Sequence, residues 1–164
     1  MKKVYHEFEP YYNNDSEILI LGSIPSVKSR EQGFYYAHPQ NKFWKIISEI
    51  YDETEPKTIE NKKEFLKKHK IALWDVIKSC DIQGSSDSSI KNIDANNINL
   101  ILKNSNIKKI FTTGKKATEL YKKYCYKNTQ KESIYLPSTS PANCGYCTYE
   151  ELLNIYKENI IEKV

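Results

Sequence analysis

The sequence contains a single arginine, Arg30, although lysine and arginine together number 25 in a chain of 164 residues. Lysine binds phosphate as a point charge, whereas arginine forms the bidentate fork that favours recognition of guanine. The formal net charge of +4 is compatible with a polyanionic partner. Broad contact with a backbone is therefore favoured over sequence-specific recognition, although a compositional bias of the source genome explains the abundant lysine equally well.

Long apolar runs and a recognisable signal peptide are also lacking. We therefore expect a cytoplasmic protein that does not contact a membrane. Only four cysteines occur. Cys144 and Cys147 have the spacing of a redox or metal pair, but Cys80 and Cys125 are isolated and no histidine lies beside them. We expect a reduced setting and no metal site.

The sequence lacks a Gly-x-Ser-x-Gly elbow, and neither Ser138 nor Ser140 is paired with a histidine in sequence, which argues against a serine nucleophile. Strands are predicted at residues 17–21, 71–77, 108–112 and 134–136. Helices are predicted at residues 42–51, 59–69, 95–103, 114–124 and 148–161, and loops at residues 23–39, 79–90 and 137–147.

This alternation predicts an α/β fold in a single domain covering residues 1–164. We expect a three-layer sandwich, with a mostly parallel central sheet flanked by helices. Ligands of such sheets lie at the carboxyl ends of the strands. The loops after Leu21, Ile77, Thr112 and Leu136 should therefore converge on one cleft.

The first of these loops has an unusual composition. Residues 22–26 (GSIPS) form a turn after a buried strand, which can direct backbone amides into a cleft. Phe34, Tyr35 and Tyr36 could form a wall for a planar group. Asn41 offers a neutral donor and acceptor where a helix begins, although it could instead be only the N-cap of that helix.

These segments resemble a known family. Residues 22–26 are similar to the water-activating loop in the first motif of the uracil-DNA glycosylase superfamily, and residues 136–143 (LPSTSPAN) resemble its second motif. Residues 37–44 (AHPQNKFW) are similar to the mismatch-specific uracil glycosylases and, more closely, to the hypoxanthine-DNA (deoxyinosine) glycosylases. Residues 73–76 (LWDV) and 84–87 (GSSD) also resemble the latter branch. The matches run from about residue 18 to residue 143.

Three positions depart from the common pattern of the superfamily. Ile24 stands where many members carry Asp or Asn, and Ser138 stands where classical uracil enzymes have His. The hypoxanthine branch shares both differences, and its catalytic asparagine maps onto Asn41. Thr113 replaces the asparagine that typically precedes the glycine after the fourth strand.

The resemblance implies a monofunctional DNA glycosylase that flips a deaminated base, hypoxanthine or uracil, out of DNA and hydrolyses its N-glycosidic bond. We expect no metal or organic cofactor, a monomer, and association with the nucleoid when the protein is bound to DNA. The expected catalytic positions are Asn41 and Ser138. Base contacts are expected from Gly22, Ser23, Ile24, Pro25, Phe34, Tyr35, Tyr36, His38 and Thr113, and DNA contacts from Lys115, Ser140, Pro141, Ala142, Asn143 and Cys144.

Three alternatives remain at this point: a uracil-specific enzyme of the same superfamily, a non-catalytic protein that binds damaged DNA, and a small-molecule α/β hydrolase or nucleotidase. Ile24 and Ser138 motivate the second. We expect Phe43, Trp44 and Trp74 to lie in the core. Asp75 and Asp87 are expected to brace turns rather than to act as bases.

Overall fold

The computed structural model describes residues 2–6, 8–83, 90–141 and 147–162. Its strands are β1 (Lys2–Tyr5), β2 (Ile18–Gly22), β3 (Ile71–Asp75), β4 (Ile77–Ile82), β5 (Lys91–Ala95), β6 (Lys109–Thr113) and β7 (Ile134–Leu136). Its helices are α1 (Val27–Gln32), α2 (Phe43–Ile50), α3 (Ile59–Lys68), α4 (Asn99–Leu102), α5 (Lys115–Leu120), α6 (Tyr126–Thr129) and α7 (Tyr149–Lys157). The π-helical turns η2 (Tyr121–Cys125) and η4 (Glu158–Glu162) continue α5 and α7.

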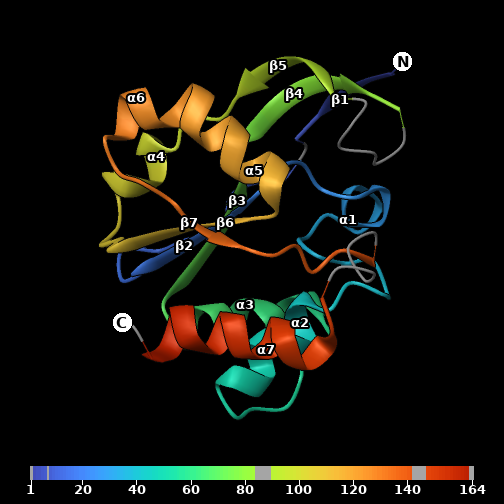
Figure 1. Cartoon of the computed structure of the whole chain (residues 1–164), viewed down its shortest axis with the longest axis vertical. Helices are drawn as coiled ribbons and strands as arrows, with labels where there is room; N and C mark the ends of the chain where they lie inside the picture. Colours follow the sequence, from blue (N-terminus) through green and yellow to red (C-terminus); the bar gives the residue numbers. More distant parts are fainter. Residues whose placement is uncertain (1, 7, 84–89, 142–146, 163–164) are drawn as a thin grey trace.

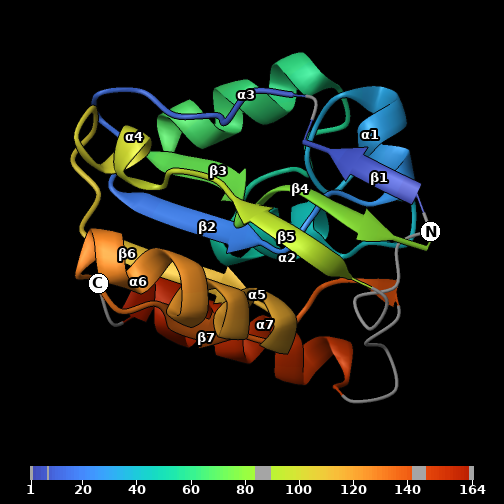
Figure 2. The same cartoon turned by 90° about the horizontal axis from the view of Figure 1, so that it is seen from above.

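The central sheet is parallel and has the strand order β3–β2–β6–β7. The inner strand β2 is buried along its whole length, which explains the uninterrupted apolar run before Gly22. Gly22 lies opposite Asp75 of β3, and Leu21 lies opposite Thr112 of β6. The strands therefore end at one edge of the sheet, where their arrowheads point in Figure 2.

Helices cover both faces of this sheet. Figure 1 shows α2, α3 and α7 below it and α4, α5 and α6 above it. The predicted apolar face of α2, formed by Phe43, Ile46, Ile47 and Ile50, is buried. Thr148 caps α7 in a capping box with Glu151, as the sequence indicates. The predicted α/β sandwich with its parallel sheet is confirmed.

A second, antiparallel sheet in the order β1–β4–β5 was not predicted. The chain leaves the parallel sheet at Val76, so the predicted strand at 71–77 is two strands. The buried Asn96 side chain donates to the backbone oxygens of Asp75 (2.8 Å) and Ile77 (3.2 Å) and so holds this break. The loop predicted at 79–90 was partly wrong, because β4 continues to Ile82. Pairing with β1 stabilises these polar residues as a strand, which local composition does not reveal.

The other differences are short elements. The helix predicted at 95–103 forms only as α4, and Ala95 belongs to β5 instead. The loop predicted at 23–39 contains α1, because the Ser26 side chain accepts a hydrogen bond from the Ser29 amide and Gly33 ends the helix with φ 75°. The segment therefore enters the site as a capped turn of helix rather than as an open loop.

Candidate active site

Three polar side chains converge on Gly22, where β2 ends. A Cβ atom at Gly22 would lie 2.6 Å from Asp75 Oδ1, 3.6 Å from Tyr36 Oη and 3.7 Å from Thr113 Oγ1. We call Asp75, Tyr36 and Thr113 the polar cluster. A side chain at residue 22 would force the carboxyl of Asp75 to move, which favours glycine there. The loops after β2, β3 and β6 thus meet, as predicted for the ends of parallel strands.

Asp75 is paired with His6, which follows β1. Asp75 Oδ2 lies 2.7 Å from His6 Nε2, and the two side chains are only 6% and 2% exposed. The other ring nitrogen, Nδ1, donates to the backbone oxygen of Phe8 at 2.8 Å. The rings of Phe8 and Tyr35 lie beside the imidazole. Sequence reasoning missed His6, because 69 residues separate it from Asp75 and no motif contains it.

Tyr36 holds a strained position at this site. Its φ is 54°, which is a left-handed conformation that tyrosine rarely adopts. Its ring stacks on Phe43 with 4.0 Å between centroids. Its hydroxyl is buried without a hydrogen bond of good geometry. Burial and the nearby Asp75 raise the pKa of Tyr36, which the proximity of Thr113 only partly offsets, so the phenol is protonated and can donate.

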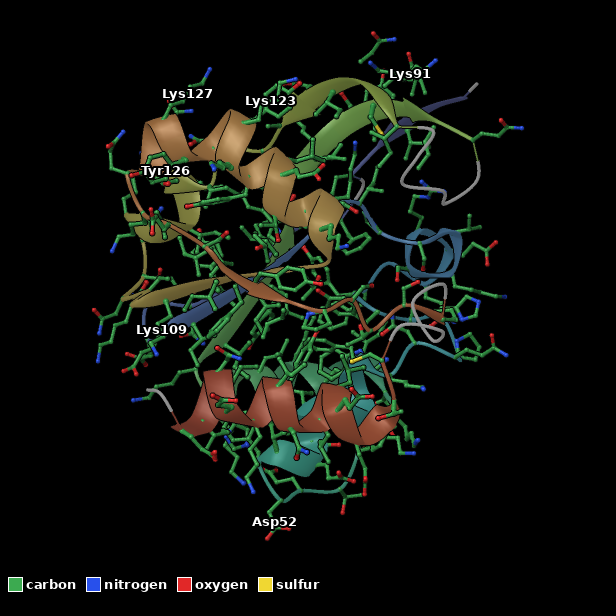
Figure 3. The ribbon with its side chains drawn as sticks, viewed as in Figure 1. Asp52, Lys91, Lys109, Lys123, Tyr126 and Lys127 are labelled. Carbon is green, nitrogen blue, oxygen red and sulfur yellow. The ribbon has the colours of Figure 1, made fainter. Side chains whose placement is uncertain are left out.

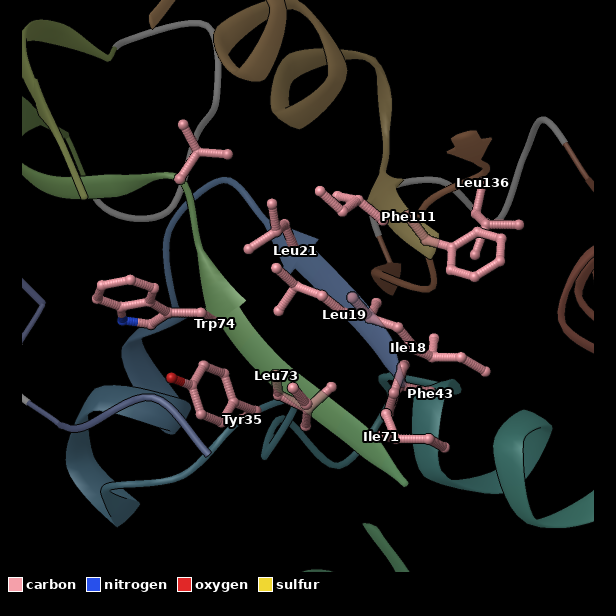
Figure 4. Close-up of a cluster of buried hydrophobic side chains, with 14 of the residues drawn as sticks. Ile18, Leu19, Leu21, Tyr35, Phe43, Ile71, Leu73, Trp74, Phe111 and Leu136 are labelled. Atoms are coloured by element: carbon pink, nitrogen blue, oxygen red, sulfur yellow. The ribbon is translucent and has the colours of Figure 1, made fainter. Parts of the chain in front are cut away.

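Two of the three expected wall aromatics are instead in the core, which corrects their assignment as base contacts. Phe34 is 4% and Tyr35 2% exposed. Tyr35 donates from its hydroxyl to the Glu9 backbone oxygen, and its own backbone oxygen accepts from the Trp44 indole. Figure 4 shows the Tyr35 ring among the buried side chains near Leu73 and Trp74. The run of three aromatics does not reveal which ring points inward, because one left-handed residue changes the direction of the chain.

The two motif loops are joined at Asn41. Its Oδ1 accepts hydrogen bonds from the Phe43 amide (2.9 Å) and from Thr139 Oγ1 (2.8 Å), and the Lys42 amide donates to the Thr139 backbone oxygen (3.1 Å). Because the Phe43 amide can only donate, these contacts fix which end of the Asn41 amide is oxygen. Both lone pairs of Oδ1 are used. The Nδ2 group remains as the donor that this half-buried side chain can offer to a ligand.

The second motif loop follows β7 and packs against the start of α5. A Cβ atom at Gly114, whose φ is 89°, would lie 3.4 Å from Ser138 Cβ. Ser138 Oγ accepts from the Ser140 amide (3.1 Å), and the Tyr156 hydroxyl donates to the Pro137 backbone oxygen (2.6 Å). This part of the loop is therefore well anchored. Pro141 ends its described part, and the expected DNA contacts Ala142, Asn143 and Cys144 lie outside the described residues, as does the segment 84–87.

Of the remaining expected base contacts, all but His38 lie in the turn after β2. The backbone oxygens of Gly22 and Ser23 accept from the amides of Val76 and Ile77. Ile24 packs partly buried against the core, and Pro25 is buried. His38 accepts from the Gln40 amide through Nδ1 at 3.0 Å, which is a local turn contact.

Lysines mark the upper surface beyond Thr113. Lys115 is exposed at the start of α5. A groove of about 710 Å³ lies between β5 and the α5–η2 helix. Its charged lining residues, within the described ranges, are Lys91, Lys116, Lys123 and Glu119. Lys91 and Lys123 project outward along this side in Figure 3. The net positive charge of the described residues that line this groove suits a phosphate backbone.

Within the described ranges, no group of three His, Cys, Asp or Glu side chains could hold a metal ion. Cys80 and Cys125 are buried, free thiols, and burial raises the pKa of Cys125 to about 11. None of the helices in those ranges has the length and apolar character needed to cross a bilayer.

Comparison with known proteins identifies the family. The model of the uracil DNA glycosylase superfamily matches residues 9–161. The chain belongs to this superfamily. It is 37% identical over 114 residues to a hypoxanthine DNA glycosylase of Methanosarcina barkeri, covering 68% of this chain and 72% of the relative. It is 33% identical to a hypoxanthine DNA glycosylase of Methanosarcina acetivorans, covering 83% of this chain and 86% of the relative.

A solved structure agrees with this assignment. The solution NMR structure of a candidate uracil DNA glycosylase from Methanosarcina acetivorans superposes with a TM-score of 0.77 at 31% identity, covering 92% of this chain and 95% of the other. The resemblance to the uracil-DNA glycosylase superfamily and the predicted α/β fold are therefore both confirmed.

Proposed function

We propose that this chain is a monofunctional DNA glycosylase that releases hypoxanthine from DNA in base excision repair. Superfamily membership and two relatives named for hypoxanthine support the activity and the base. The observation that carries the assignment of the site is the hydrogen-bonded junction of the two motif loops at Asn41 and Thr139. Uracil is the second candidate base, because it is also a product of deamination and gives the superfamily its name.

Asn41 is proposed to position the attacking water. Since its Oδ1 already accepts two hydrogen bonds, its Nδ2 donates to one lone pair of the water and leaves the other lone pair for C1′ of the sugar. Cleavage of an N-glycosidic bond builds positive charge on the sugar. Such a cation accepts water without prior deprotonation, so orientation replaces a general base. After the C1′–O bond has formed, the water loses a proton, which passes to the departing base anion directly or through solvent, so that the products are a neutral base and an abasic sugar.

The departing base carries the negative charge. Backbone N–H groups of Gly22, Ser23 and Ile24 are proposed to stabilise it as in an oxyanion hole. The bonds from Val76 and Ile77 to the Gly22 and Ser23 oxygens support this, because they hold the turn in one conformation before substrate binds. Among the aromatic residues, Tyr36 is the remaining candidate for contact with the base.

Contact with DNA is proposed at two places. Ser138, Ser140 and Pro141 belong to the anchored second loop, whose continuation through Ala142, Asn143 and Cys144 is proposed to press into the duplex. Lys115 and the lysines of the groove beside α5 are proposed to contact phosphates. Extrusion of the nucleotide costs a few kcal/mol and is easiest at a mismatched or damaged pair.

The test is a panel of duplexes, each containing one modified base, followed by alkaline cleavage of abasic sites. We expect release of hypoxanthine, and the ratio to uracil separates the two candidate specificities. Tight binding of a lesion without release of any base would instead support a binding protein. Trapping of a covalent complex with borohydride would show a lysine nucleophile and would contradict the monofunctional assignment.

Replacing Asn41 by alanine gives the sharpest test of the site. We expect the single-turnover rate to fall by about 10²- to 10³-fold, the usual loss for one positioned polar group in an active site, with DNA affinity nearly unchanged by fluorescence anisotropy. Asn14→Ala is the matched control, because Asn14 is exposed before the opposite end of β2. Full activity of Asn41→Ala would remove Asn41 from the mechanism.

A further inference from the structure

Two buried polar groups at Gly22 have no part in the mechanism above. One is the carboxyl of Asp75, and the other is the hydroxyl of Tyr36. Burying polar groups is costly unless they are satisfied. Their position around the turn proposed to bind the base suggests that a ligand satisfies them.

The hydrogen bonds of His6 fix what Asp75 can do. The Phe8 backbone oxygen can only accept, so His6 Nδ1 carries a proton. The 2.7 Å contact between Nε2 and Asp75 Oδ2 requires a second proton between those atoms. The pair is therefore either imidazolium with carboxylate or imidazole with carboxylic acid, and is neutral overall in both forms. In both forms the proton lies on the Oδ2 side, so Oδ1 beside Gly22 is an acceptor.

The Tyr36 hydroxyl supplies a hydrogen-bond donor near this acceptor. It is protonated and lacks a well-formed bond within the described part of the chain. It lies near the same point as Asp75 Oδ1, within 3.6 Å of the Cβ position built on Gly22. One acceptor and one donor thus both lie within 3.6 Å of the Cβ position built on Gly22, at the end of β2. A ligand edge that matches them carries a ring N–H next to a carbonyl oxygen.

We propose that Asp75 Oδ1 and the Tyr36 hydroxyl recognise the lactam edge of the extruded base, with His6 as the residue that positions Asp75. This inference rests on the proposed function. Hypoxanthine presents N1–H and O6, and uracil presents N3–H and an adjacent carbonyl. Adenine and cytosine present an unprotonated ring nitrogen and an amino group, which place acceptor against acceptor and donor against donor. The pair would therefore select bases by the change that deamination makes.

The test compares hypoxanthine with unsubstituted purine, which lacks both the N1 proton and O6, in otherwise identical duplexes opposite thymine. Single-turnover release rates are measured for both bases. We expect Tyr36→Phe to lower the ratio of hypoxanthine to purine by about tenfold, and Asp75→Leu to lower it by about 10- to 100-fold, as hydrogen bonds to neutral and charged groups commonly contribute. A merely structural role would slow release of both bases equally.

Two further variants sharpen the test. Asp75→Asn should keep most of the ratio, because the new amide can donate to the Nε2 lone pair of a neutral His6 while its oxygen faces Gly22. Asp94→Leu makes the same change as Asp75→Leu at an exposed residue of β5 and should leave the ratio unchanged. Tyr36→Phe removes only a hydroxyl without a good partner, so it should fold even if Asp75→Leu does not.

The outcomes separate this inference from the proposed function. Wild-type protein that releases neither base would contradict the proposed function. Wild-type protein that releases hypoxanthine, with an unchanged ratio in Tyr36→Phe, would overturn the lactam contact alone. A ratio that collapses in Asp75→Asn as far as in Asp75→Leu would show that Asp75 acts through its proton, and would overturn the acceptor role.

Discussion

Among the described residues, two histidine–carboxylate pairs lie in very different surroundings. His6 and Asp75 are 2% and 6% exposed at the end of the parallel sheet. His69 and Glu53 are 15% and 27% exposed. The second pair lies beside Asp52, which projects from the lower edge of the molecule in Figure 3. Glu53 is also paired with Lys68 at 3.2 Å.

The difference shows that contact between the same groups does not imply the same role. Water screens the His69–Glu53 pair, and the Tyr51 ring stacks on the imidazole with 3.9 Å between centroids. The His69–Glu53 pair can therefore act as a brace between α3 and the turn after α2. The His6–Asp75 pair is desolvated, so it persists only because each polar atom of the imidazole has a partner. The second carboxyl oxygen of Asp75, Oδ1, lies beside Gly22 with the other two members of the polar cluster. This position makes it a candidate for contact with substrate.

The largest expected effect is the loss of one partner from the buried pair. His6→Leu leaves the Asp75 carboxyl buried beside apolar rings, so we expect the free energy of unfolding to fall by about 3–5 kcal/mol, measured by urea denaturation at pH 7. The double variant His6→Leu/Asp75→Leu removes both polar groups and should recover most of this loss. A cost below about 1 kcal/mol for His6→Leu would place this pair with ordinary surface pairs.

A smaller effect is expected from Gly22→Ala. The new methyl group would lie 2.6 Å from Asp75 Oδ1, so the carboxyl must move away from His6 or from Gly22. We expect a loss of about 1–3 kcal/mol in unfolding free energy, as for other overpacked sites. The same substitution in an Asp75→Ala background is the control, because the clash is then absent. Equal costs in both backgrounds would contradict the close approach.

The smallest effect is expected at the exposed pair. Partial burial works to raise the pKa of Glu53, but hydrogen bonds from His69 and Lys68 outweigh it and lower that pKa. A lowered carboxyl pKa stabilises the fold above the unfolded-state value and ceases to do so as pH falls through the folded-state value. Glu53→Gln should cost at most about 1 kcal/mol at pH 7, and the difference from wild type in urea denaturation should shrink as the pH falls below the ordinary carboxyl pKa. A larger cost in acid than at pH 7 would contradict this sign.

The elements that the sequence predicted well are those whose signal is local. The apolar run before Gly22, the apolar face of α2 and the capping box at Thr148 each lie within one segment, and each formed where expected. The antiparallel sheet was missed because β4 is held as a strand by pairing with β5 and with β1, which lies more than 70 residues earlier. Its polar composition resembles a loop when it is considered alone.

The candidate site divides in the same way. Asn41 and the residues of the two motif loops could be named from the sequence, because each motif is contiguous. The roles of Phe34 and Tyr35 were misjudged, since the left-handed backbone at Tyr36 decides which ring faces the site. His6 could not be found, because its importance depends entirely on Asp75.

The sequence by itself determined the strands of the parallel sheet, the superfamily and the motif residues, because local periodicity and contiguous motifs carry that information. Only the tertiary structure decided which atoms of those residues remain available. Asn41 keeps its Nδ2 donor because Thr139 and Phe43 occupy its oxygen, and Asp75 presents an acceptor because His6 holds the proton on the other side. Hydrogen-bond capacity is shared among neighbours in space, so the properties of a side chain at this site depend on residues far from it in sequence.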